Sequence, residues 1–207
     1  MNPRTRRERI AGPAGVLECA IDEPVGAARG VAVLCHPHPQ GGGTMEHKVV
    51  QTLARAFVQL GLRAVRFNYR GVGASEGAWD EGRGEVDDAL AVIAAYREPA
   101  GPGAAPLVLG GFSFGGYVAA AAASRLAEGE KAARLVLIAP STEKQDVPAV
   151  PSDTVVIHGE ADELVPLAAT LDWARPQSLP VVVVPGAGHF FHGQQTLLKD
   201  IVLRLAR

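Results

Sequence analysis

One serine in the sequence stands in a setting that suits a nucleophile. Gly111-Phe112-Ser113-Phe114-Gly115 matches the pattern G-x-S-x-G, with an apolar run before it and an alanine-rich run after it. In this pattern a sharp turn from strand to helix lifts the serine hydroxyl out of a sheet, and the glycines let the backbones approach closely. The first N–H groups of the helix then point toward the serine. Ser113 is therefore a candidate nucleophile. The alternative is a serine that only caps the helix, which would leave both glycines unexplained.

A serine hydroxyl needs an imidazole to take its proton and a carboxylate to orient that imidazole. Candidates for both follow apolar, strand-like runs farther along the chain. Asp162 lies shortly after TVVIHG, and His189 follows PVVVV and a Gly-Ala-Gly turn. The sequence thus predicts Asp162 as the acid and His189 as the base. Glu160 and Glu163 remain alternative acids, and His192 remains an alternative base.

Acyl chemistry at a serine also needs two N–H donors for the oxyanion of the tetrahedral intermediate. One donor is expected from the backbone of Phe114, the residue after the serine. The second is expected from the loop CHPHPQGGG, which follows another strand-like run. Pro37 and Pro39 have no N–H, so the backbone of His38 is the donor between them, in a position that the two prolines would stiffen. A rigid turn that only covers the sheet edge is the alternative for this loop.

Strands and helices that alternate along the chain must position these residues. Short runs rich in β-branched and apolar residues predict strands over residues 16–21, 29–35, 62–68, 106–111, 133–139, 154–159 and 180–184. Apolar residues at helical spacing predict helices over residues 45–60, 86–93 and 198–205, and the run from residue 114 adds another. This alternation predicts an α/β fold with a doubly wound, mostly parallel sheet flanked by helices. Its site should lie at the carboxyl ends of the strands.

Several motifs resemble those of a known superfamily. GFSFGG, HGEADELVP and GAGHFFHG are similar to the nucleophile, acid and histidine motifs of α/β-hydrolase superfamily serine hydrolases. With LCHPHPQGGGTMEHKVV and FNYRGVGASEG, they resemble a small, cap-less bacterial branch of dienelactone-hydrolase-like proteins, from about residue 29 to the end. The resemblance implies the α/β-hydrolase fold and makes Asp162 the acid of H-G-x-x-D-x-x-V-P. The dienelactone-hydrolase-like relatives use a cysteine nucleophile, so Ser113 argues against a lactone-diene substrate.

These residues and this resemblance predict a serine hydrolase that cleaves a carboxylic ester through an acyl-enzyme. The same groups would serve an acyltransferase, a thioesterase or a peptidase, and a catalytically inactive binding or scaffold protein could share the fold. The expected partner is a small-molecule acyl substrate, with no cofactor and no metal. Residues 142–153 leave no room for an inserted cap, so an open site is expected.

Length and composition fit one domain over residues 1–207. Formal net charge is −2, and the one basic cluster lies in residues 1–14, which are expected to form a flexible arm. Its members are Arg4, Arg6, Arg7 and Arg9. So narrow a cluster argues against nucleic-acid binding. No window reaches the roughly 18 apolar residues of a spanning helix, so a cytoplasmic protein without a membrane partner is expected. The oligomeric state stays open.

Other reactive side chains have plainer interpretations. Cys19 and Cys35 lie in apolar runs and should be buried, reduced thiols. His158 ends a strand and should be a buried, hydrogen-bonded histidine. A further group lacks the ligand spacing of zinc hydrolases; it consists of His36, His38, His47 and Glu46. Candidates for the pocket wall, or for loop packing alone, follow another strand: Tyr69, Arg70 and Trp79.

Overall fold

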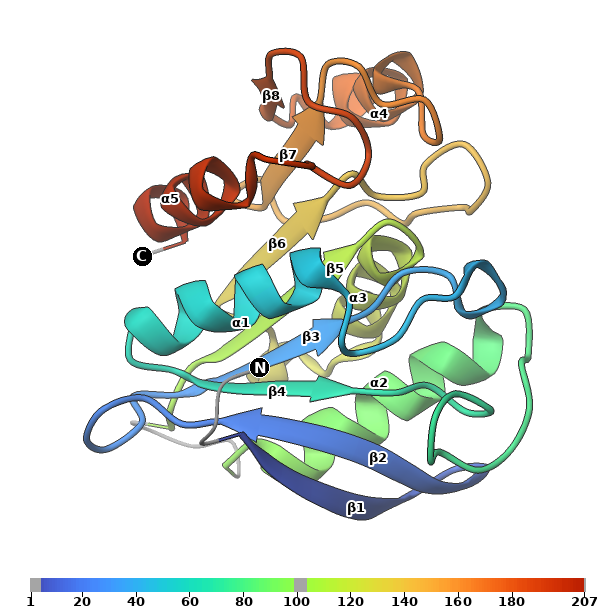
Figure 1. Ribbon diagram of the computed structural model, residues 1–207, viewed down its shortest axis with the longest axis vertical. Helices are drawn as coiled ribbons and strands as arrows, with labels where there is room; N and C mark the ends of the chain where they lie inside the picture. Colours follow the sequence, from blue (N-terminus) through green and yellow to red (C-terminus); the bar gives the residue numbers. More distant parts are fainter. Residues whose placement is uncertain (1–4, 99–103, 207) are drawn as a thin grey trace.

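Eight strands form one sheet in the order β1-β2-β4-β3-β5-β6-β7-β8 (Figure 1). The computed structural model describes residues 5–98 and 104–206. The strands are β1 (Arg6–Gly12), β2 (Gly15–Asp22), β3 (Val31–Cys35), β4 (Arg63–Phe67), β5 (Leu107–Phe112), β6 (Arg134–Ile138), β7 (Val155–Gly159) and β8 (Val181–Val184). β2 pairs antiparallel with β1 and with β4, and the other neighbouring pairs are parallel. The predicted mostly parallel sheet is confirmed.

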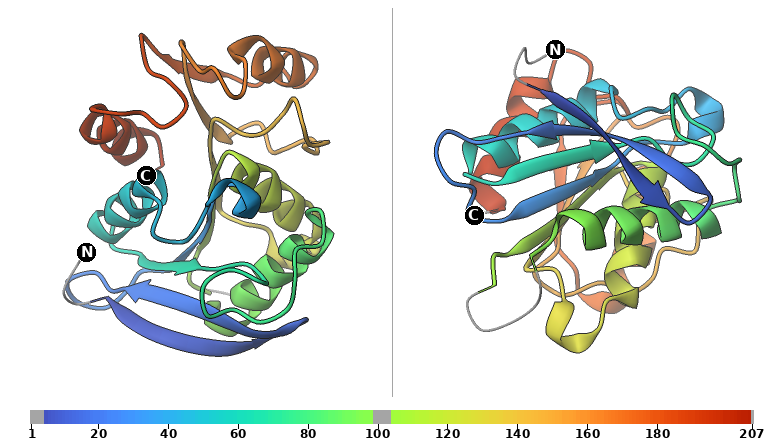
Figure 2. Two further views of the ribbon diagram at one scale, coloured as in Figure 1. Left: turned by 45° about the vertical axis from the view of Figure 1, so that its right-hand side comes forward. Right: turned by 90° about the horizontal axis from the view of Figure 1, so that it is seen from below.

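Helices cover both faces of this sheet (Figure 2). α1 (Lys48–Gln59) and α5 (Gln195–Leu205) lie on one face, and α2 (Arg83–Tyr96) and α3 (Phe114–Arg125) lie on the other. α4 (Leu167–Ala174) packs beside β7. The residues of β3 and β5 are buried along the whole of each strand, as apolar strands covered on two faces should be. The apolar sequences of β3 and β5 therefore require helices on both faces of the sheet.

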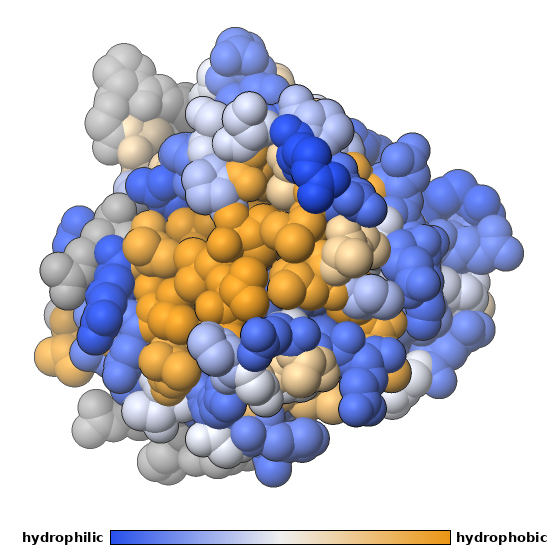
Figure 3. Space-filling view, turned by 90° about the horizontal axis from the view of Figure 1, so that it is seen from above, coloured by the Kyte–Doolittle hydropathy of each residue, from blue (hydrophilic) through white to orange (hydrophobic). Residues whose placement is uncertain are grey.

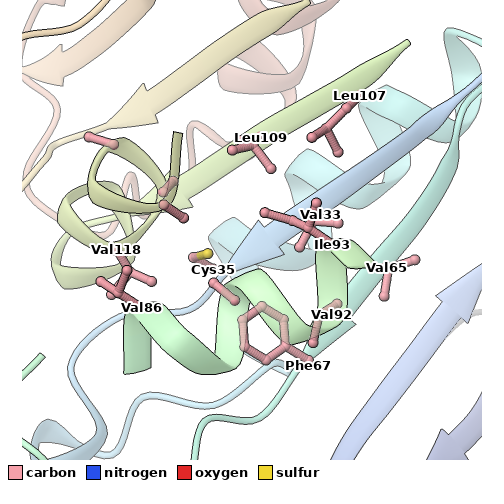
Figure 4. Packing of buried hydrophobic residues seen from close by; sticks show 14 of the residues in the cluster. Val33, Cys35, Val65, Phe67, Val86, Val92, Ile93, Leu107, Leu109 and Val118 are labelled. Atoms are coloured by element: carbon pink, nitrogen blue, oxygen red, sulfur yellow. The ribbon is translucent and has the colours of Figure 1, made fainter. Parts of the chain in front are cut away.

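The larger core lies between the sheet and the pair α2 and α3. Figure 4 shows Val33 and Leu109 on the sheet, with Ile93 of α2 near Val33, and Val86 of α2 beside Val118 of α3. A second core joins the opposite face of the sheet to α1 and α5 through residues that include Leu34, Phe57, Ile157, Leu198 and Val202. Cys19 and Cys35 are buried free thiols, as predicted. Because both faces of the sheet are packed against helices, the strands whose ends carry the candidate site are held in position.

The expectation of a flexible arm over residues 1–14 is wrong for residues 6–12. They form β1, which pairs with β2 from Arg6 opposite Ile21 to Gly12 opposite Gly15. Residues 1–4 of the expected arm lie outside the described residues. The sequence RRERIAG does not look like a strand, because β1 is an edge strand without a fully buried residue. Most of its side chains are accordingly charged. A charged edge strand has the composition of a solvated arm.

Two further differences concern helices. α4 was not expected, because its eight residues form a short element with little apolar periodicity. The helix expected over residues 45–60 begins at Lys48, after a turn in which His47 caps α1 by accepting a hydrogen bond from Val49 N. Met45 is buried ahead of the helix. Residues 142–153 contain no helix or strand, which confirms that no cap is inserted there.

β8 closes one end of the sheet. Figure 3 looks onto that end, where an apolar area lies in the middle of the face and hydrophilic residues surround it. The exposed large apolar side chains include Leu171 of α4, Val183 of β8 and Leu197 of α5. Within residues 5–98 and 104–206, no helix is long and apolar enough to cross a membrane.

Candidate active site

Ser113 occupies a strained turn between β5 and α3. Its φ angle is +57°, in the left-handed region that residues with a Cβ rarely adopt. The backbone holds this conformation through a hydrogen bond from Ser113 N to Ile138 O (2.9 Å) and another from Ser141 N to Ser113 O (3.2 Å). A Cβ at Gly111 would overlap the carbonyl oxygen of Gly115. The glycines of G-x-S-x-G are therefore required by the close approach that the sequence predicted.

The side chain of Ser113 does not cap α3. No amide of the helix donates to its hydroxyl. Instead Ser113 Oγ lies 3.0 Å from Nε2 of His189, in the loop after β8. The alternative of a simple capping serine is thus contradicted by the geometry.

His189 connects Ser113 to Asp162, in the loop after β7. His189 Nδ1 lies 2.7 Å from Oδ2 of Asp162. Because a carboxylate only accepts hydrogen bonds, Nδ1 carries the hydrogen of the neutral ring, and Nε2 is left to accept from the serine hydroxyl. The side chains of His189 and Asp162 are both buried. The predicted base and acid therefore meet Ser113 in the order that proton transfer requires.

Asp162 is held as a carboxylate by several N–H groups. Its Oδ1 accepts hydrogen bonds from Leu164 N (2.9 Å) and Val165 N (2.8 Å). Burial acts to raise the pKa of this group, but the hydrogen bond from His189 and the two amides outweigh burial and lower the pKa below its usual value. A carboxylate that stays ionised can orient the imidazole and stabilise the positive charge that it gains.

A second histidine lies beside the same carboxylate. His158 is fully buried, and its Nε2 donates a hydrogen bond to Val165 O (2.9 Å), as the sequence expectation of a buried, bonded histidine requires. The same Nε2 lies 3.4 Å from Oδ2 of Asp162. Nδ1 of His158 has no hydrogen-bond partner among the described residues, and burial lowers the pKa of the ring. His158 is thus a neutral N–H donor directed toward the turn that carries the acid.

The backbone amides of Phe114 and His38, the two predicted oxyanion donors, belong to neighbouring segments of the chain. Phe114 is the first residue of α3, so its N–H has no acceptor within the helix. The His38 N–H donates to no group within the described residues. The rings of His38 and Phe114 are 5.1 Å apart, and Trp79 packs against both. A Cβ at Gly115 would overlap Cys35 O, so α3 begins directly against the loop that carries His38.

The alternative acids and base lie outside this chain of hydrogen bonds. Glu160 is exposed, and its carboxylate accepts from Gly186 N (2.9 Å), which ties the loop after β7 to the loop that leads to His189. Glu163 and His192 are exposed, and neither has a hydrogen bond to Ser113 or His189. The geometry favours Asp162 and His189 over these alternatives.

The histidines considered as metal ligands have other partners. His36 is fully buried, with Nδ1 donating to Pro37 O (2.7 Å) and Nε2 accepting from Tyr69 N (3.2 Å). Burial lowers its pKa to about 3. His47 caps α1, and burial lowers its pKa to about 4. In the part of the chain that is described, no three His, Cys, Asp or Glu side chains gather as a metal site.

Of the three candidates for the pocket wall, two serve loop packing. Tyr69 is fully buried, and its hydroxyl donates to His36 O (3.1 Å). Arg70 pairs with the buried carboxylate of Asp88, with Arg70 Nη2 2.8 Å from Asp88 Oδ1. Trp79 is partly exposed and packs against the rings of His38 and Phe114, so it lies beside the candidate site.

Aromatic rings that the motifs did not assign surround His189. Phe112 lies 4.9 Å from His189 between ring centroids, and Phe190 lies 5.1 Å from it. His47 stacks on Phe112 at 5.0 Å. Phe112 and Phe190 are sequence neighbours of Ser113 and His189, which was the available signal. His47 gave no such signal, because its proximity depends on how the loop before α1 folds.

A cavity of about 600 Å³ lies beside α1 and includes none of these residues. The candidate site is flanked by smaller, open cavities. One of about 480 Å³ is lined by His189, and one of about 300 Å³ lies along the loop after β3 and Trp79. The candidate site is identified by its hydrogen bonds and not by the size of a cavity. A serine hydroxyl joined in this way to an imidazole and a carboxylate can be activated to attack an acyl carbon.

Comparison with known proteins agrees with this description. Residues 26–152 match the family model described as serine aminopeptidase, S33. An α/β serine hydrolase homologue of Coxiella burnetii is 38% identical, with 96% of each chain covered and a TM-score of 0.84. An α/β serine hydrolase without lid from Xanthomonas campestris is 37% identical, with 99% of this chain and 94% of that chain covered and a TM-score of 0.86.

A curated relative covers less of the chain. An uncharacterized protein of Rickettsia prowazekii is 37% identical over 108 residues, which are 52% of this chain and 45% of that protein. The match therefore spans less than half the length of that relative.

Proposed function

Since the chain belongs to the family described as serine aminopeptidase, S33, within the α/β-hydrolase superfamily, we propose that it is a serine hydrolase of small carboxylic esters. The observation that carries this proposal is the hydrogen-bonded series from Ser113 through His189 to Asp162. An open site without an inserted cap suits small or accessible substrates.

The proposed mechanism starts from the hydrogen bond between Ser113 and His189. His189 Nε2 takes the proton of Ser113, and Oγ attacks the acyl carbon while the carbonyl oxygen gains negative charge. The N–H groups of His38 and Phe114 bind this oxyanion. The protonated His189 then gives its proton to the leaving alkoxide, which departs as an alcohol. Water, deprotonated by His189, attacks the acyl-enzyme, and the protonated His189 then returns this proton to Ser113 Oγ as the acid is released.

Hydrolysis of an aminoacyl amide bond is the second candidate. The family description favours it, because a serine aminopeptidase uses the same nucleophile on an amide carbonyl.

The test combines labelling with turnover. Wild type and Ser113→Ala are treated with a fluorophosphonate probe, and both are assayed on p-nitrophenyl esters of rising chain length and on aminoacyl p-nitroanilides. Ser124→Ala, which removes an exposed serine of α3, is the control. We expect labelling and ester turnover in wild type and Ser124→Ala, and a loss of at least about 10³-fold in Ser113→Ala.

Each other outcome has a definite meaning. Faster Ser113-dependent turnover of anilides than of esters would favour the peptidase. Absence of both labelling and turnover in wild type would contradict an acyl hydrolase and favour a binding protein on the same fold.

A further inference from the structure

An open cleft of about 480 Å³ adjoins His189. We call it the His189 cleft and define it by His189, Phe190, His192, Glu163 and Leu164, together with the backbone near Gly186 and Gly188. It lies at the carboxyl ends of β7 and β8, in the loops that carry Asp162 and His189. The cleft is thus attached to the acid and base part of the site.

The mechanism decides which part of a substrate lies on this side. After Ser113 attacks, His189 Nε2 must deliver its proton to the leaving oxygen, so the leaving group lies against His189. The carbonyl oxygen points instead toward His38 and Phe114, whose loop borders the separate cavity beside Trp79. The leaving group is therefore the substrate part with direct access to the His189 cleft.

The walls of the His189 cleft present apolar groups to solvent. Leu164 is 47% exposed and Phe190 is 37% exposed, and both line the same cleft. Phe190 is held by rings on two sides, since it lies edge-on to His189 at 5.1 Å and 5.6 Å from His192. An apolar group resting on Leu164 and Phe190 would remove both from water.

The charge of the cleft wall limits which leaving groups the cleft can bind. Glu163 brings a carboxylate to the wall, and among the described residues that line the cleft there is no Lys or Arg. An anionic leaving group would meet this carboxylate without a cation to balance it. Uncharged or cationic groups meet no such penalty.

We propose that the His189 cleft is a leaving-group subsite that binds an uncharged, apolar or aromatic alcohol portion of the substrate through Phe190 and Leu164. This inference rests on the proposed ester hydrolysis and adds its alcohol specificity. Specificity then lies in the loops after β7 and β8.

The test varies the alcohol while the acyl group stays constant. Methyl acetate and benzyl acetate have alkoxide leaving groups of similar basicity, so they differ mainly in the contact that the alcohol makes. Each is assayed with wild type, Phe190→Ala and Leu164→Ala. Leu197→Ala is the matched control, because Leu197 is equally exposed at 47% but lies on α5 outside the cleft.

We expect wild type to prefer benzyl acetate in kcat/KM, and each cleft variant to reduce that preference by about tenfold. Leu197→Ala should keep the preference of wild type. p-Carboxybenzyl acetate should be a poorer substrate than benzyl acetate, and Glu163→Gln should narrow this difference.

Two results would overturn the inference alone: Ser113-dependent turnover with equal benzyl-to-methyl ratios in wild type and both cleft variants, or variants that change the dependence on acyl length instead. The second result would place the acyl group in the cleft. Absence of any Ser113-dependent ester turnover would instead contradict the proposed function, so the two failures are distinguishable.

Discussion

Nε2 of His158 lies 3.4 Å from Oδ2 of Asp162, the same oxygen that His189 contacts at 2.7 Å. His158 also donates to Val165 O, while Val165 N donates to Asp162 Oδ1. The buried ring therefore fixes the turn of residues 162–165 from one side while Asp162 fixes it from the other. Position 158 should accordingly influence turnover although its side chain has no contact with Ser113.

We expect His158→Phe to lower kcat about tenfold with little change in KM, since loss of a buried donor leaves Val165 O unpaired and the carboxylate less well oriented. His158→Gln keeps an N–H donor and should recover part of the loss. Steady-state kinetics on variants with wild-type circular dichroism provide the measurement. An unchanged kcat in the phenylalanine variant would show that the ring only fills space.

Replacement of the acid should be far more damaging. Asp162→Asn removes the charge that favours the required tautomer of His189, and kcat should fall by about 10³- to 10⁴-fold. Glu160→Gln changes an exposed carboxylate and should retain most of the activity. Initial rates on one p-nitrophenyl ester compare the two. A larger loss in the Glu160 variant would transfer the role of acid to that residue.

The base can be identified by substitution and by pH. His189→Gln should abolish turnover, whereas His192→Gln, at an exposed position, should not. In wild type, kcat/KM should decrease on acidification, because a protonated imidazole cannot accept the Ser113 proton. A pH–rate profile from pH 4 to 9 measures this. Activity that stays constant down to pH 4 would count against His189 as the base.

A glycine pair tests the loop of the expected oxyanion donor. A Cβ at Gly43 would overlap Pro37 O and come within 2.7 Å of His38 O, whereas a Cβ at Gly41 meets nothing within 4 Å. Gly43→Ala should shift the His38 amide and lower kcat by about 10²-fold, the scale of one lost oxyanion donor. Gly41→Ala should behave like wild type. Equal kcat values in the two variants would argue against His38 as a donor.

His36 should make stability depend on pH. Its folded-state pKa of about 3 lies below the ordinary value of 6.5, because burial disfavours the charged ring. Between these values the unfolded chain binds the proton more readily, so stability present above pH 6.5 is lost as the pH falls toward 3. The loss from this residue at pH 5 is about 2 kcal/mol.

Urea unfolding at pH 7, 6 and 5 tests this contribution. His36→Gln should be less stable at pH 7 but should show a weaker dependence on pH than wild type. Parallel curves for the two proteins would mean that His36 does not contribute. Loss of stability with rising pH over this range would contradict the sign of the linkage.

The strands that carry the site were predictable because they are buried on both faces. The runs before Ser113, Asp162 and His189 became β5, β7 and β8 with boundaries shifted by one residue or so. G-x-S-x-G also predicted the strained turn, since its glycines are required by backbone contacts that any such turn makes. Local sequence was sufficient where local geometry sets the structure.

Features that depend on distant contacts were not predictable. β1 is a strand only because β2 pairs with it, and its charged sequence suggested an arm. The distance from His158 to Asp162 depends on the path of the chain from β7 to Val165, and no motif expresses it. The position of His47 near Phe112 likewise follows from the fold of the loop before α1. Tertiary packing decided these cases.

The buried thiols of Cys19 and Cys35 are natural probes of how often the folded sheet opens. Burial raises the pKa of Cys19 to about 11 and that of Cys35 to about 12, so almost no thiolate exists at neutral pH in the folded sheet. An alkylating reagent can then react only during excursions that expose β2 or β3 to solvent. The rate at which iodoacetamide alkylates each thiol would therefore report how often β2 and β3 become exposed, without an engineered label.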